Sequence, residues 1–122
     1  MEITSLRKTN SMLLSLQGRF DAGAADDFKE KMRTLTAQGV ACYVIDLSRV
    51  SYIDSGGLGS LVTSLRRVRE IQGDIRIASL SDKVRKVFEL TRVYRIFDIY
   101  DSSESAVASY QAEAVQGVPL CI

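Results

Sequence analysis

The chain has 122 residues, and 46% of them are apolar, which suffices for one domain with a real buried core. Its 16 basic and 15 acidic side chains leave a formal charge of +1, without the clustered positive charge that binding to a phosphate backbone needs. No apolar run approaches the roughly 20 residues of a membrane span. The first ten residues lack the charged and apolar blocks of a signal peptide. We therefore expect a cytoplasmic protein that binds no membrane and no nucleic acid directly.

The histidine and cysteine content argues against a catalytic or metal centre. Histidine, the commonest general base and metal ligand, does not occur in the sequence. Cys42 and Cys121 stand far apart, and neither belongs to a closely spaced pair of the kind that ligates zinc or exchanges disulfides. We expect no catalytic residue, no metal and no cofactor, and interpret the chain as a protein-binding module rather than an enzyme.

The first part of the chain predicts a hairpin, a helix and a central strand. Residues 2–8 and 12–17 are typical of two strands joined by a polar turn. Asp21 suits a helix N-cap, and apolar residues then recur at helical spacing until Gly39 supplies the stop. Residues 40–47 are nearly all apolar and rich in β-branched side chains, which indicates a strand covered on both faces.

Helices and strands alternate in the rest of the chain. Apolar spacing predicts a helix over 58–68 that ends near Gly73, followed by a strand over 75–80. Ser81 is expected to cap a short helix, and 96–100 to form a last strand.

The end of the chain predicts one more helix. Asp101 and Glu104 have the spacing of a capping box, which would open it. Gly117 and Pro119 would end it and leave a short tail at about 116–122.

The whole pattern indicates a single α/β domain that spans residues 1–122. Strands that alternate with helices after an opening hairpin favour a mixed β-sheet, in which the hairpin adds an antiparallel pair to a parallel core. About four helices should cover it. No repeat, linker or low-complexity stretch divides the chain.

The loop after the central strand is the candidate functional site. Functional groups in open α/β sheets gather beyond the carboxyl ends of the strands, where helix N-termini point their free amides. Ser55 stands at or just before the first turn of the following helix, and glycines leave the backbone around it bare to a partner. The loop consists of Asp54, Ser55, Gly56, Gly57, Leu58 and Gly59. The alternative is that Ser55 or Asp54 only caps the helix and the glycines only shape a tight turn.

Three catalytic interpretations of this loop fail on its residues. A phosphate-binding P-loop needs a lysine after its last glycine, where Ser60 follows Gly59. A hydrolase elbow needs glycine in place of Ile53 and a histidine elsewhere. A response-regulator receiver would use Asp54 as phosphoacceptor, but it would open with a strand leading into a helix rather than with a hairpin.

The stretch DLSRVSYIDSGGLG, residues 46–59, resembles the central motif of the STAS domain, found in bacterial anti-sigma factor antagonists and at the ends of sulfate transporters. Residues 18–21, GRFD, are similar to the glycine and aspartate that follow the family's second strand. The resemblance continues through residues 77–100 and leaves out the tail. Because no membrane segment is present, the resemblance favours the soluble antagonist branch, the anti-anti-sigma factors.

The resemblance implies a partner-switching cycle in transcription regulation. The unmodified domain would bind an anti-sigma factor that is also a serine kinase, and phosphorylation of Ser55 would release it. A PP2C-type serine phosphatase would restore the unmodified form. The implied partner-binding residues are Asp21, Asp54, Ser55, Gly56, Gly57, Leu58 and Gly59.

The resemblance also implies roles for two aspartates. Asp21 should lie beside Ser55 and join the partner contact, while Asp54 orients the loop; alternatively, or in addition, Asp21 is a plain helix cap. Many relatives carry Ser or Thr directly after the phosphoacceptor, where this chain has Gly56, which leaves Ser55 as the single candidate hydroxyl in the loop.

Two further points stay open at the level of sequence. Arg66, Arg67 and Arg69 form a small basic cluster, which indicates a solvated helix face or else a rim contact with an acidic partner. The rival function is a STAS module that binds a nucleotide or other small ligand, or serves as a scaffold, without phosphorylation. Glycines at a helix N-terminus would suit an anionic ligand such as a nucleotide.

Overall fold

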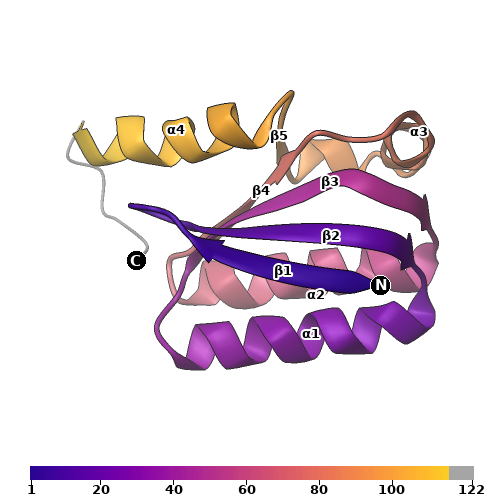
Figure 1. Ribbon diagram of the computed structural model, residues 1–122, viewed down its shortest axis with the longest axis horizontal. Helices are drawn as coiled ribbons and strands as arrows, with labels where there is room; N and C mark the ends of the chain where they lie inside the picture. Colours follow the sequence, from indigo (N-terminus) through magenta and orange to yellow (C-terminus); the bar gives the residue numbers. More distant parts are fainter. Residues whose placement is uncertain (116–122) are drawn as a thin grey trace.

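The computed structural model describes residues 1–115, and a five-stranded sheet organises them (Figure 1). Its spatial order follows the chain, and only the first pair, β1 with β2, is antiparallel. The strands are β1 Glu2–Arg7, β2 Met12–Phe20, β3 Cys42–Ile53, β4 Asp74–Ala78 and β5 Asp98–Tyr100. The predicted mixed sheet with its opening hairpin is confirmed. The strand predicted over 40–47 corresponds to the first half of the central β3, which begins two residues later, at Cys42.

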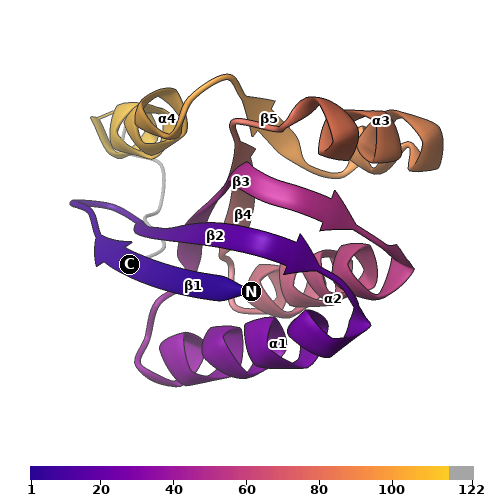
Figure 2. The same cartoon turned by 45° about the vertical axis from the view of Figure 1, so that its right-hand side comes forward.

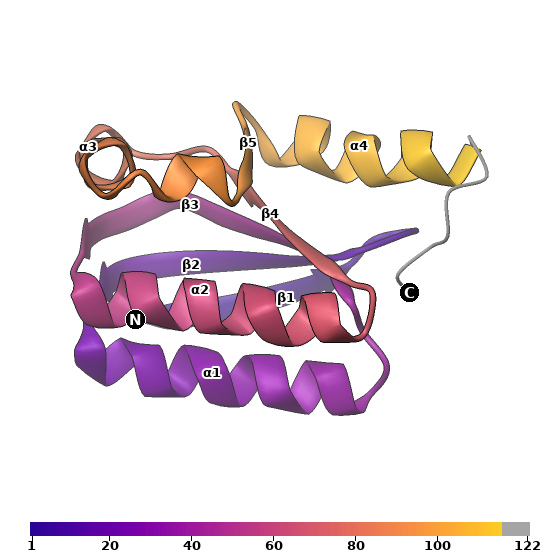
Figure 3. The same cartoon turned by 180° about the vertical axis from the view of Figure 1, so that it is seen from behind.

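In the part of the chain that the structure describes, four α-helices and one 3₁₀ turn cover the sheet. The helices are α1 Ala22–Ala37, α2 Ser55–Glu70, α3 Asp82–Thr91 and α4 Ser103–Val115, and the turn η1 is Val93–Arg95. Helices α1 and α2 lie side by side on one side of the sheet, and α3 and α4 lie on the other (Figures 2 and 3). Within residues 1–115, every helix falls short of the length and apolar character that crossing a bilayer requires.

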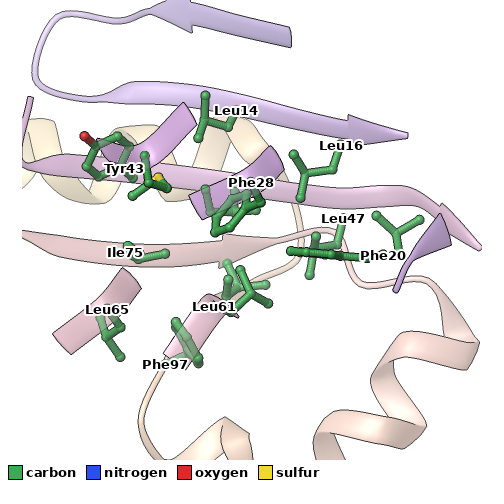
Figure 4. Close-up of a cluster of buried hydrophobic side chains, with 14 of the residues drawn as sticks. Leu14, Leu16, Phe20, Phe28, Tyr43, Leu47, Leu61, Leu65, Ile75 and Phe97 are labelled. Atoms are coloured by element: carbon green, nitrogen blue, oxygen red, sulfur yellow. The ribbon is translucent and has the colours of Figure 1, made fainter. Parts of the chain in front are cut away.

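The main core fills the space between the sheet and the helix pair α1 and α2 (Figure 4), and it extends to α3 through Val84 and Phe88. Alternate residues of β2 and β3 point into it, and the helices contribute side chains three and four positions apart. Its largest fully buried members include Leu14, Leu16, Phe20, Phe28, Tyr43, Leu61, Leu65 and Ile75. Phe20 and Phe28 meet with ring centroids 5.3 Å apart, which joins the end of β2 to α1. Burying this apolar surface is the main force that holds α1 and α2 on the sheet.

A buried polar cluster fastens α4 to the opposite side of the sheet. The Tyr110 hydroxyl lies 2.9 Å from the carbonyl oxygen of Tyr43 and 3.1 Å from that of Asp74. Arg76 is only 5% exposed; its guanidinium lies 3.9 Å from the centroid of the Tyr110 ring and also binds Ser109 and Glu113. Burial raises the pKa of Tyr110 far above its ordinary value, so the phenol stays protonated and keeps its donor.

The strand and helix boundaries depart from the sequence predictions in places. Strands β2 and β3 run on to Phe20 and Ile53, further than expected, because irregularities in their register let the pairing continue. The Ser81 hydroxyl donates to the carbonyl of Val50 at 2.9 Å instead of capping α3. At α4 the cap is Ser102, whose oxygen accepts from the Ser105 amide at 3.1 Å, so the predicted capping box at Asp101 is wrong.

Glycine was predicted to end both the first and the last helix. Gly39 follows α1 with a φ of 93°, and the next amide, that of Val40, donates back to the Leu35 carbonyl at 3.1 Å, so the predicted glycine stop is confirmed. Gly117, Pro119 and the predicted tail lie outside the described residues.

Replacing Tyr110 with Phe should lower the free energy of unfolding by about 1 to 3 kcal/mol, because two buried carbonyl oxygens lose the donor they share. Tyr94→Phe is the matched control, since Tyr94 is 45% exposed. Urea unfolding of both variants and the parent checks this. Equal stabilities for the two variants would contradict the fastening role of the hydroxyl.

Candidate functional site

The site begins where two neighbouring parallel strands end. Phe20 and Ile53 are register partners at the ends of β2 and β3, and an aspartate follows each of them. Asp21 accepts the amide of Ala24, and Asp54 accepts the amide of Gly57, each at 3.0 Å. Both aspartates are thus side-chain N-caps, as predicted for Asp21, and both helices leave the same edge of the sheet (Figure 1).

Glycine is required where the start of α2 meets the end of β2 and the start of α1. The amide of Asp54 donates to the Phe20 carbonyl oxygen at 3.3 Å. A Cβ on Gly57 would overlap that same oxygen, and a Cβ on Gly56 would stand 2.7 Å from the Cα of Ala22. This close approach puts the first turns of the two helices in contact, so Asp21 and Ser55 occupy adjoining helix starts.

Ser55 is the first residue of α2, and its side chain is exposed. The Asp54 carboxylate takes the amide of Gly57, whereas the amides of Ser55 and Gly56 precede the first position that an intrahelical bond can satisfy. The next serine along α2, Ser60, is only 3% exposed, and its hydroxyl donates to the Gly57 carbonyl. Ser55 is therefore the accessible hydroxyl of the loop.

Two carboxylates set the electrostatics of this edge. The pKa of Asp21 is held below its ordinary value, chiefly because the carboxylate accepts the Ala24 amide, with the positive charge of Arg19 adding to the effect. Asp21 and Asp54 therefore place negative charge at both helix starts. The negative charge of these two carboxylates would repel a phosphate-bearing ligand, so this arrangement disfavours the nucleotide site considered from the glycines.

Arg19 and Tyr52 flank the site, and no functional role was predicted from the sequence for either side chain. They are cross-strand partners, and each stands two residues before a capping aspartate. The Arg19 guanidinium lies 4.1 Å from the centroid of the Tyr52 ring, and the tyrosine remains 38% exposed. An ordered pair of Arg and Tyr is typical of protein interfaces. The signal in the sequence was an aromatic residue in a part of β3 where polar residues prevail.

The seven residues implied as partner contacts divide by exposure. Ser55 and Gly59 are exposed, and Asp21, Asp54 and Gly56 are half-buried, whereas Gly57 and Leu58 are buried. The structure thus brings all seven together, but Gly57 and Leu58 act within the fold, in the packing beneath the loop. That these residues bind a partner stays a prediction.

Comparison with known proteins identifies the family. The STAS domain matches residues 2–106. The chain belongs to the STAS family. The anti-sigma-B factor antagonist of Bacillus subtilis is 34% identical over 98 residues, covering 80% of this chain and 89% of that protein.

Solved structures agree on the STAS fold. An anti-sigma factor antagonist from Mycobacterium paratuberculosis superposes with a TM-score of 0.78 at 22% identity, covering 88% of this chain and 93% of that one. The phosphorylated form of the Bacillus cell fate determinant SpoIIAA gives 0.71 at 22% identity, covering 88% and 98%. At these identities the likeness concerns the fold, which agrees with the STAS fold expected from the sequence.

Gly57→Ala should destabilise the protein by more than about 2 kcal/mol, because the added methyl overlaps the Phe20 backbone, which cannot move without breaking the strand pairing. Gly59→Ala is the matched control: its added methyl meets open space, and alanine should raise helix stability by up to about 1 kcal/mol. Thermal and urea unfolding measure both. Similar effects of the two substitutions would contradict the close approach at Gly57.

Proposed function

We propose that this protein is an anti-sigma factor antagonist whose partner binding is switched at Ser55. The unmodified protein binds an anti-sigma factor that is also a serine kinase, phosphorylation of Ser55 releases it, and a PP2C-type phosphatase restores it. The protein itself is a cytoplasmic binding module without catalysis. The observation that carries the proposal is the exposed Ser55 at the start of α2, in a STAS domain whose relatives are named anti-sigma factor antagonists.

The charges around Ser55 support a switch of this kind. A phosphate adds about 1.5 to 2 negative charges at neutral pH. On the free protein that charge points into water at a helix N-terminus, where the helix dipole favours it. Under a bound partner the same charge would be desolvated close to the carboxylates of Asp21 and Asp54, so association weakens.

The alternative, a STAS module that binds a small ligand or acts as a scaffold without phosphorylation, has less support. The two capping carboxylates would repel an anionic ligand at this edge, and the Gly57 amide already donates its hydrogen bond to Asp54. Calorimetry with nucleotide separates the two functions, since the proposed switch requires no nucleotide binding by this protein.

Incubation with the cognate kinase and ATP should place one phosphate on the protein, at Ser55. Mass mapping of the modified protein measures this, and Ser55→Ala should abolish the modification. Ser51→Ala serves as the control because Ser51 is exposed nearby and donates to the Gly18 carbonyl at 3.3 Å. Phosphate on Ser48, Ser51 or Ser60 with Ser55 unmodified would refute the site.

Ser55→Ala should keep partner binding and make it permanent, whereas Ser55→Asp should weaken it. Loss of compensation for a charge in an interface costs roughly 2 to 5 kcal/mol, and Asp should give part of the effect of phosphate because it carries less charge. Partner titrations measure affinity, and thermal melts of the same samples should show little change. A large fall in melting temperature would mean that the charge acts through the fold, and loss of binding in Ser55→Ala would make the hydroxyl itself a contact.

A further inference from the structure

A groove of about 300 Å³ lies between α1 and α2 on the surface that these helices turn away from the sheet. Its floor is formed by side chains that are almost fully buried, including Met32, Ser64 and Val68. Its rim carries the cations Lys29 and Arg33 from α1 and Arg67 from α2. An apolar floor with a positively charged rim fits a ligand that is apolar along one stripe and acidic beside it.

The rim cations differ in how far their charge is already neutralised. Lys29 lies 3.6 Å from Asp26, and Arg33 pairs with Glu30, each partner one turn away on α1. Arg67 has no carboxylate within 4 Å among residues 1–115. Arg67 therefore contributes the uncompensated positive charge of the groove.

The arginine cluster seen in the sequence separates into different roles on α2. Arg69 turns toward the C-terminal half of the chain, where it donates to the Ile96 carbonyl at 3.0 Å and lies 3.7 Å from Asp74. Arg67 lines the groove, and Arg66 is exposed on the helix outside the groove lining. Arg66 and Arg67 are thus neighbours of equal charge in different surroundings.

Both helices that form the groove begin at the edge that carries Ser55, and most of the residues that line the groove lie in the later halves of the two helices. Ser64 and Arg67 stand nine and twelve residues after Ser55, which corresponds to about 14 to 18 Å along α2. A standard protein interface buries about 800 Å² on each partner, enough to span this distance. One bound protein can therefore contact Ser55 and the groove at once.

We propose that the groove is a second contact for the partner that binds at Ser55, and that it receives an acidic amphipathic helix of that partner. Two helices side by side expose a furrow into which the apolar stripe of a third helix packs. Apolar side chains of the incoming helix pack against the exposed Ala37 and the carbon stems of Lys29 and Arg67, and a carboxylate beside them pairs with Arg67. This inference rests on the proposed function only for the identity of the partner.

Charge reversal at two neighbouring arginines tests the groove. Binding of the purified cognate anti-sigma factor kinase is titrated against the unmodified full chain, Arg67→Glu and Arg66→Glu, at low and at high salt. Arg67→Glu should weaken binding at least about tenfold at low salt, and less at high salt, because it sets a negative charge against the incoming carboxylate. Arg66→Glu should stay within about threefold of the parent, which is the expectation for a rim charge outside the contact.

A second variant tests the shape of the groove without changing charge. Ala37 is exposed at the end of α1 and lines the groove. Ala37→Tyr should therefore fill the groove and lower the affinity for the kinase at least about tenfold, while the melting temperature stays nearly unchanged. Equal effects of Arg66→Glu and Arg67→Glu, or parental affinity for Arg67→Glu and Ala37→Tyr, would overturn the groove contact. The proposed function would then still stand, provided that Ser55→Asp weakens binding. Failure of the parent protein to bind the kinase would refute both the groove contact and the proposed function.

Discussion

The parallel pairing of β2 with β3 at their carboxyl ends is the constraint on which the rest of the structure depends. It makes Phe20 and Ile53 register partners, so α1 and α2 begin side by side, directly after the two strands end. Gly57 permits α2 to begin against the Phe20 carbonyl, and Gly56 permits it to touch α1. The two helices must then run together over one side of the sheet, where their apolar stripes close the main core (Figure 3). Core and site therefore share one geometric cause.

On the opposite side of the sheet, α3 joins the main core through Val84 and Phe88, whereas α4 is held by different means. A smaller apolar cluster under α4 includes Val44, Ala78 and Ala106, and the buried Arg76 and Tyr110 add directed polar contacts to it. The guanidinium of Arg76 contacts the tyrosine ring and binds Ser109 and Glu113. Its buried Nε has no hydrogen-bond partner among the described residues and lies 3.5 Å from an oxygen of Asp74, so the charge is compensated by neighbouring groups rather than fully hydrogen-bonded. These polar contacts fix the position of α4 where apolar area alone would leave it less defined.

Much of the fold could be predicted from the sequence because periodicity and caps are local signals. The helix over 58–68, the cap at Asp21 and the stop at Gly39 depend on nearby residues and are confirmed. The extension of β3 and the use of Ser81 depend on contacts with β2 and Val50, which no local pattern reveals. For the same reason the loop around Ser55 could be located from its motif, whereas the pairing of Arg19 with Tyr52 needed the cross-strand register. Likewise, the different surroundings of Arg66 and Arg67 could not be predicted, because they depend on how α1 packs beside α2.

In the proposed switch, the position of Ser55 lets a charge control binding while it leaves folding nearly unchanged. In the free protein a charge on Ser55 meets Asp21 and Asp54 through water, where two unit charges 4 Å apart interact by only about 1 kcal/mol. The favourable field of the α2 N-terminus offsets part of that repulsion. A bound partner excludes the water, and at the effective dielectric of a protein surface the same pair interacts by about 4 kcal/mol. The capping aspartates accept helix amides in the fold. In the proposed switch they also make the edge, once a partner covers it, intolerant of further negative charge. A site with neutral caps, such as two serines, would hold its helices as well but would discriminate less between the modified and unmodified forms.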